Sequence, residues 1–344
     1  AFWLGGIPFK RKPFGRFISE RDNEKRFERY HMGAMTVYLY VVGAISMIKL
    51  MGLYVGGQFS AENIGSAEGV MGQGIVAHMV LSSYALIPII FLYWTYKREV
   101  IYIIPIIMIM IATFTTLIKY NVIGLLVSIF LFTAIYNKKI LKKAIVLLVI
   151  VVVATFVGNY ALTFFIHGEM PDTIFYLQHL WKYISGSLIY DNYIFVTGIR
   201  TDVSIGYKLM TFLCALPNMF LGKLFDITLF PHERQNDLLV SSFDEKSNVV
   251  DAIGYLFPSR GTIMEVILFL GVMFLIGFLF TGIYRKCIFV SSRFSTFLAN
   301  FLGYFVFFSF FGTFYINSGP WEILVYSLVL PPLFYKKGGI TWNA

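Results

Sequence analysis

Most residues able to do chemistry fall in one long polar segment, 167–260, of an otherwise apolar chain. It carries ten of the 19 acidic residues and three of the five histidines. The acids are scattered, and no Asp-x-Asp pair is present to hold a divalent ion with a nucleotide-sugar pyrophosphate. The chain also lacks a Gly-rich phosphate loop, HExxH and GxSxG, and Cys214 and Cys287 lack metal-ligand spacing. We therefore expect no metal and no cofactor, which leaves binding, transport or a reaction driven by an activated lipid.

Four cations are candidates for binding phosphate. Arg200, Arg234 and Arg260 lie in the polar segment, and Lys119 lies at a tight turn between two apolar stretches. A guanidinium makes bidentate hydrogen bonds to phosphate oxygens and keeps its charge at any working pH. Near lipid, such a cation would stabilise the charge on a departing pyrophosphate. The competing interpretation is a surface cation paired with acids or lipid headgroups, or, for Arg260, an anchor at the start of a span.

Candidate proton acceptors are His167 and His232, at two places in the polar segment, and Glu265, one turn into the apolar stretch after it. Neutral imidazole titrates near physiological pH. An intramembrane carboxylate is a functional candidate because burying its charge is costly. A lone histidine near an interface is more often a structural hydrogen-bonder, and Glu265 could simply pair with Arg260.

Eight apolar stretches must position these residues. The chain is 58% hydrophobic and 14% charged, with a mean hydropathy of +0.72, and a bilayer-spanning helix needs about 20 apolar residues. Because the stretches are continuous rather than alternating, strands are excluded. We predict an all-α polytopic membrane protein with about eight transmembrane helices. They are expected at Ala34–Gly56, Ile75–Tyr96, Val100–Ile118, Val122–Asn137, Ala144–Ile166, Thr262–Tyr284, Ser295–Ile316 and Pro320–Tyr335.

The placement of lysine and arginine predicts the orientation of these helices. Of the 28 basic residues, 19 lie in five clusters that share one side if the eight spans alternate, and that side should be cytoplasmic. The net charge of +9 is then a topology signal rather than a sign of nucleic-acid binding. The predicted order is a cytoplasmic segment 1–33, five spans in 34–166, an external loop 167–260, three spans in 261–337 and a cytoplasmic tail 338–344. The apolar start of the chain could be the end of an earlier span.

One stretch inside the polar segment, 206–224, is apolar enough to suggest a ninth span. It is short, contains Pro217, and has Lys208 and Lys223 near its ends. As a span it would turn the last two basic clusters outward. We therefore predict a re-entrant or interfacial amphipathic helix on the outer face.

Three short motifs accompany this arrangement. They are the tight turn Leu117–Asn121, the aromatic Tyr183–Gly186 followed by Tyr190–Asn192, and Asn248–Tyr255 shortly before a glycine that opens the next span. With them the chain resembles the bacterial oligosaccharide repeat unit polymerases, the Wzy-type O-antigen and capsule polymerases. It departs from the family pattern at Pro258–Gly261, where an Asp-Phe-Gly-like element is expected.

The resemblance implies a metal-independent glycosyltransferase of the GT-C type in the bacterial inner membrane. Its substrates would be undecaprenyl-pyrophosphate-linked oligosaccharides at the outer face, and its other partners membrane lipids and a chain-length regulator. The four cations would bind pyrophosphate, and Glu265, His167 or His232 would accept the proton of the acceptor hydroxyl. Tyr183, Tyr190 and Asp191 would contact the sugars.

Two alternatives fit the same chain. A ligase of the same fold would hand the finished polymer to a different acceptor, such as lipid A core. A transporter would place its functional charges near the bilayer midplane and break its spans in paired positions. The charges here lie in the polar segment and at the outer ends of the spans, which favours surface chemistry.

Overall fold

The computed structural model describes residues 27, 29–58, 74–114, 119–136, 141–167, 172, 174–178, 181, 204–231, 262–289, 295–306 and 318–336. Nearly all of these residues are helical, which confirms the predicted all-α class for this part of the chain. Its single β-type contact is an isolated antiparallel bridge between Tyr30 and Tyr335.

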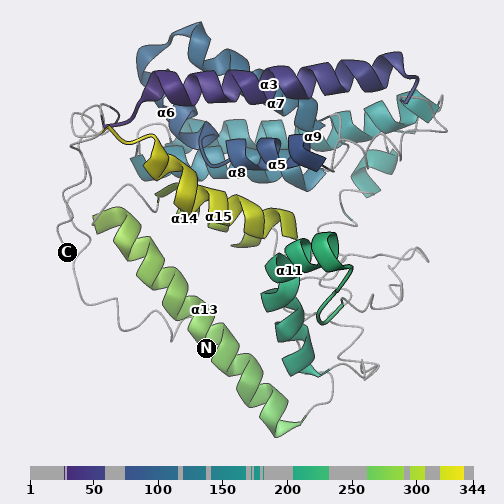
Figure 1. Cartoon of the computed structure of the whole chain (residues 1–344), viewed down its shortest axis with the longest axis vertical. Coiled ribbons are helices and arrows are strands. Elements are labelled where there is room, and N and C mark those ends of the chain that lie inside the picture. Colours follow the sequence, from purple (N-terminus) through teal and green to yellow (C-terminus); the bar gives the residue numbers. More distant parts are fainter. Residues whose placement is uncertain are drawn as a thin grey trace. The chain divides into compact units, whose positions relative to one another are not determined.

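The helices coincide closely with the apolar stretches of the sequence, because continuous apolar runs satisfy their backbone groups internally. They are shown in Figure 1. Their bounds are α3 Met32–Val55, α5 Gly74–Ser83, α6 Ile87–Lys97, α7 Val100–Phe114, α8 Lys119–Tyr136, α9 Leu141–His167, α11 Ile205–Phe225, α13 Ile263–Phe289, α14 Ser295–Phe301, the π-helical η4 Leu302–Val306 and α15 Ser318–Leu333.

The chain divides into two compact units. The bundle unit comprises Gly15–Pro171, Cys287–Tyr304 and Ile323–Ala344. The α11–α13 unit comprises Ala1–Phe14, Asp172–Lys286 and Phe305–Glu322. The second unit therefore combines most of the polar segment with the long apolar helix next in the sequence.

Among the described helices, one meets the length and apolarity needed to cross a bilayer on its own, α3. The pair α5 and α6 makes a second candidate if it is counted as one span bent by 48°. α7 is apolar but shorter. The sequence predicts a single helix over Ile75–Tyr96, and this prediction is wrong at its centre, where the chain leaves the helix at residues 84–86. Pro88 contributes to the break, because it lacks the N–H that a continuous helix would direct to the carbonyl four residues earlier.

Small residues let the helices of the bundle unit approach closely. Along α3, which runs beside α7 (Figure 1), a Cβ atom at Gly43 would lie 3.1 Å from Met108 Cβ. Between α8 and η4, a Cβ at Gly124 would overlap the Tyr304 ring, and one at Gly303 would overlap Ser128 Oγ. Close packing through small residues is what the predicted membrane location would require, since helices in lipid lack a hydrophobic driving force for association.

The start of α3 and the end of α15 are tied together within the bundle unit. The Tyr30 and Tyr335 rings stack with centroids 4.5 Å apart, and their hydroxyl oxygens are 2.9 Å apart. Two backbone hydrogen bonds flank the rings, from His31 N–H to Phe334 O at 2.8 Å and from Lys336 N–H to Arg29 O at 2.9 Å. We call these four interactions the tyrosine clasp.

Candidate functional site

The helix α11 buries a lysine in its first turn. Its Ser204 cap accepts a hydrogen bond from the Tyr207 N–H at 3.2 Å, which satisfies one of the free amides of a helix start. Ile205, Lys208 and Thr211 succeed one another at spacings of three residues on the buried face, and Lys208 is only 2% exposed. A lysine is almost never buried to this degree without a partner.

The opposite face of α11 is apolar and exposed. Met210, Leu213, Phe220 and Leu224 lie at helical spacings along it, with exposed fractions up to 71% at Leu224. The helix is therefore amphipathic in the reverse of the usual sense, with its cation inward and its apolar side chains outward. This pattern accords with the interfacial or re-entrant helix expected at 206–224, whose position in a membrane stays a prediction.

The helix α13 buries a carboxylate in its first turn. Thr262 caps it, because its hydroxyl accepts the Glu265 N–H at 3.3 Å and its carbonyl accepts the Val266 N–H at 3.1 Å. Glu265 is 6% exposed, whereas the nearby apolar Ile263 is 81% exposed. Here too the charged side chain is inward and an apolar one outward.

Lys208 and Glu265 interact electrostatically within the α11–α13 unit. Burial lowers the pKa of the Lys208 ammonium from its ordinary 10.5 to about 8, and the Glu265 carboxylate opposes part of that shift. Glu265 is also favoured at a helix start, where the backbone amides present positive charge. The arrangement brings a carboxylate together with an amine whose protonation changes near pH 8, a combination suited to proton transfer.

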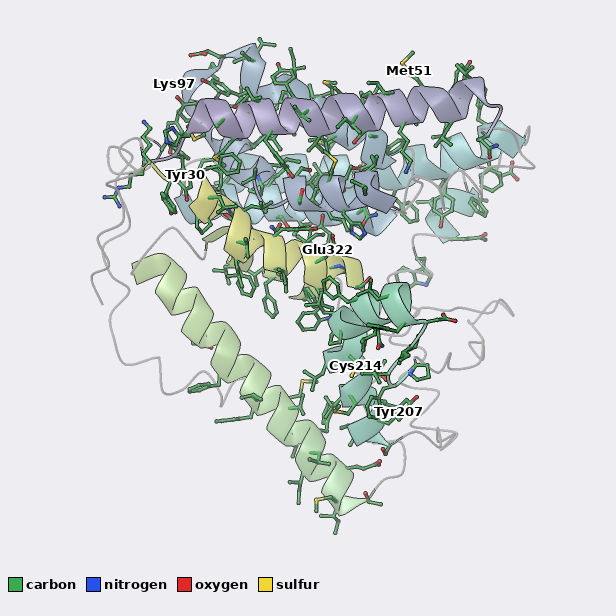
Figure 2. All side chains as sticks on the ribbon, in the orientation of Figure 1. Tyr30, Met51, Lys97, Tyr207, Cys214 and Glu322 are labelled. Carbon is green, nitrogen blue, oxygen red and sulfur yellow. The ribbon has the colours of Figure 1, made fainter. Side chains whose placement is uncertain are left out.

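A return segment after α11 runs back along the same helix. Its backbone turns at Asp226, in the left-handed conformation with φ 56°. The Asn218 amide then holds Leu229 twice, donating to its carbonyl at 2.7 Å and accepting its N–H at 2.8 Å. The Tyr207 hydroxyl donates to Pro231 O at 3.0 Å. Tyr207 lies near the start of α11 and Cys214 farther along it (Figure 2).

The return segment leads directly into a polar stretch of the sequence. Pro231 is its last described residue and precedes His232, Glu233 and Arg234. Its anchor, Tyr207, is adjacent in the chain to the buried Lys208. The polar stretch therefore starts from a backbone position fixed against the first turn of α11.

Of the residues predicted from the sequence, Glu265 is the one whose side chain the structure describes. Lys119 begins α8 and His167 ends α9, and only their backbone is described. The other predicted residues lie outside the described residues: His232, Arg200, Arg234, Arg260, Tyr183, Tyr190 and Asp191. The pairing of Glu265 with Arg260 thus stays a prediction.

Lys208 is not among the residues that the sequence predicts for the site. A signal for it is present, since it lies three residues after Ile205 and three before Thr211, on the face opposite the apolar stripe. Within the described ranges, no three His, Cys, Asp or Glu side chains gather to hold a metal ion. The absence of a metal and of a cofactor stays a prediction from the sequence.

Comparison of the chain with protein-family models, curated proteins and solved structures gave no match. A function for the protein must therefore be inferred from its own residues.

Proposed function

We propose that this protein is a membrane-embedded glycosyltransferase that polymerises undecaprenyl-pyrophosphate-linked oligosaccharides at the outer face of the bacterial inner membrane. The observation that carries the proposal is the buried pair of Lys208 and Glu265 at the first turns of α11 and α13. The family resemblance of the sequence supplies the substrate class. The eight-span GT-C arrangement belongs to the same proposal.

In the proposed reaction a sugar hydroxyl of one lipid-linked unit attacks the anomeric carbon of the growing chain. The new glycosidic C–O bond forms as the bond from that carbon to the pyrophosphate oxygen breaks, and undecaprenyl pyrophosphate leaves. The hydroxyl proton passes to the Glu265 carboxylate. General-base catalysis of this kind contributes about 10²–10⁴-fold to a rate.

Lys208 has a supporting role in this scheme. A cation attracts a carboxylate, and burial strengthens the attraction. Lys208 would thus hold the Glu265 carboxylate in position to accept the proton of the incoming hydroxyl. The leaving pyrophosphate would be neutralised by Arg200, Arg260, Lys119 and Arg234, since guanidinium and ammonium groups stabilise such charge.

The proposal is tested by deleting the gene in its host and resolving lipid-linked and surface glycans. We expect loss of the polymer ladder with single repeat units retained. Restoring the gene with Arg200→Ala or Arg260→Ala should leave the ladder absent at normal protein levels. A normal ladder in the deletion strain would refute polymerisation, and a normal ladder in both variants would refute the pyrophosphate assignment alone.

Ligation shares this chemistry and is separated by its product. A ligase mutant accumulates long polymer on the lipid carrier and lacks it on the final acceptor, whereas a polymerase mutant has no long polymer at all. If the deletion strain behaved as a ligase mutant, the proposed roles of Glu265 and Lys208 would stand, but the polymer would be transferred to a different acceptor.

A transporter is the second candidate, and the broken helix α5–α6 favours it. Transporters often bind their substrates at discontinuous helices inside a bundle, and the break here is fully buried. In that case deletion would leave the ladder pattern unchanged while impairing movement of a solute or lipid across the membrane. Proteoliposomes containing the purified chain would show solute flux without any glycosidic bond being formed.

A further inference from the structure

The break between α5 and α6 removes two carbonyl groups from the helical hydrogen-bond ladder. In a continuous helix Tyr84 O would accept from residue 88, but Pro88 has no N–H. The Ile89 N–H, which would reach Ala85 O, donates instead to Leu86 O at 3.0 Å. Tyr84, Ala85 and Leu86 are each 0% exposed, so bulk solvent cannot replace the lost donors.

Asn300 of α14 supplies a donor to the first of these carbonyls. Its Nδ2 lies 3.2 Å from Tyr84 O and 2.7 Å from Ser327 Oγ. The Ser327 hydroxyl donates its proton to Ile323 O at 2.7 Å, so it accepts from Asn300. Both amide protons of Asn300 are therefore used.

These contacts also fix the orientation of the Asn300 amide. Turning it over would place Oδ1 against the Tyr84 carbonyl, and two acceptors cannot form a hydrogen bond. In the fixed orientation Oδ1 is buried and has no hydrogen-bond partner within the described part of the chain. Leaving such a group unsatisfied costs about 1–3 kcal/mol, more than most proteins tolerate without a reason.

We propose that the break binds one water molecule, which donates one hydrogen bond to Asn300 Oδ1 and the other to the Ala85 carbonyl. Both groups are pure acceptors, and water carries two protons. A buried water needs room and about two to four polar partners, and these two acceptors supply the partners. The bound water would donate the hydrogen bonds that Asn300 does not supply at the break.

A sodium ion is the other ligand that two oxygen acceptors could attract. A buried cation needs a compensating anion or many more ligands. Among the described residues, the break offers two acceptors, Asn300 Oδ1 and the Ala85 carbonyl, which suffice for a water and are few for a sodium ion. Glu322 is buried on α15 five residues before Ser327, so sodium is kept as an outcome of the test.

The test is hydroxyl-radical footprinting by X-ray pulse of the full chain in lipid nanodiscs, in water enriched with ¹⁸O. Radicals formed from a bound water attack the side chains around it, so Tyr84 should acquire label although it is fully buried. Met35 is the matched control, because it is equally buried at 0% exposure and intrinsically reactive, and it should remain unlabelled.

Two variants sharpen the result. Asn300→Leu removes the acceptor and should abolish the Tyr84 label, whereas Ser327→Ala keeps Asn300 Oδ1 and should retain it. If Asn300→Leu unfolds, Met35 becomes labelled as well, and the comparison of Tyr84 with Met35 in the unmodified protein then decides. An unlabelled Tyr84 in the folded protein would overturn the proposal. The proposal would also be overturned if sodium, but not choline, protected Tyr84 from labelling or raised the Tm of the protein.

Discussion

The two units of the molecule bury polar groups in opposite ways. The bundle unit buries neutral ones, and most are paired: Tyr84 OH donates to Thr113 Oγ1 at 3.0 Å, and Tyr304 OH to Asn121 O at 3.0 Å. The α11–α13 unit buries Lys208 and Glu265 while turning apolar side chains such as Ile263 and Leu224 outward.

This contrast separates packing from chemistry. Neutral hydrogen bonds between helices contribute modest stability and fix which helices meet. A buried pair of opposite charges seldom improves stability over apolar side chains of the same size, because each charge loses its hydration. The charges of the α11–α13 unit therefore call for an explanation through function, and the neutral groups of the bundle unit do not.

The strongest test of this distinction is Glu265→Gln. The amide keeps the size and the burial but cannot accept a proton, so we expect polymerisation to slow by about 10²–10⁴-fold. The initial rate is measured with purified protein in proteoliposomes and a lipid-linked repeat unit. Thermal stability within a few degrees of the unmodified protein would serve as the control. A rate within about twofold of normal would show that Glu265 is not the general base, and His167 and His232 would then be the candidates.

A second test replaces Lys208 by Met and by Arg. Without the cation the Glu265 carboxylate loses an attractive charge that helps to hold it in place, so polymerisation should slow in Lys208→Met. Lys208→Arg keeps the charge and should retain most of the rate. Equal rates for all three proteins would show that Lys208 has a packing role only.

Substitutions in the bundle unit should change the stability of the protein rather than its activity. Gly303→Val forces a side chain against Ser128 Oγ and the Gly124 carbonyl, and overpacking of this kind costs about 1–3 kcal/mol. We expect a lower Tm with unchanged activity per folded molecule. Gly271→Val is the matched control, because nothing lies within 4 Å of a Cβ there. A loss of activity at full stability in Gly303→Val would break the division between the units.

The lowered pKa of Lys208 has a consequence for stability against pH. Between about 8, its folded value, and 10.5, its ordinary value, the unfolded chain binds a proton that the folded chain does not. The contribution of Lys208 to the free energy of unfolding should therefore rise with pH across that interval. The rise is measured as the difference in Tm between the unmodified protein and Lys208→Met at several pH values, which cancels groups common to both. A difference that does not change with pH would contradict the burial of a titrating amine.

The smallest expected effect concerns the return segment. Asn218→Asp keeps the acceptor for Leu229 N–H and loses the donor to its carbonyl, a change of about 1 kcal/mol. Hydrogen exchange at residues 226–231 should accelerate, and a weaker binding of the donor substrate would link the segment to the site. Asn218→Ala should enlarge both effects. Unchanged exchange in both variants would show that Tyr207 alone holds the segment.

The sequence is sufficient to predict most helices, since long apolar runs leave the backbone few options. The bounds of α3 and of α11 agree with the predicted 34–56 and 206–224 to within two residues. The break at residues 84–86 does not emerge from the sequence, because a proline can also lie within a helix, as Pro105 and Pro217 do. Pro88 differs from these two prolines in having a tertiary partner nearby. Asn300, more than 200 residues away in the sequence, supplies the donor to Tyr84 O that the proline lacks.

For the site, the sequence identifies Glu265 but not its partner. The cost of burying a carboxylate is enough to select it without a structure, because an acid inside an apolar run is rare. Lys208 lies near the end of a short apolar stretch, and its spacing from Ile205 and Thr211 is only a weak signal, because the sequence does not show which side of the first turn is covered. The spacing that aligns it with Ile205 and Thr211 gains meaning only once its burial beside Glu265 is known.

The tyrosine clasp joins two points of the chain that lie 305 residues apart in the sequence. Because residues 29–31 and 334–336 are joined by backbone hydrogen bonds, the stretch of chain between them, which includes α11 and α13 as well as the bundle helices, is a closed loop. Segments that precede and succeed it leave from one point, so fluorophores attached to both would exchange energy for as long as the loop stays shut. Mechanical tension applied to those two segments would load the clasp first, so the clasp should open before any helix of the bundle is pulled apart.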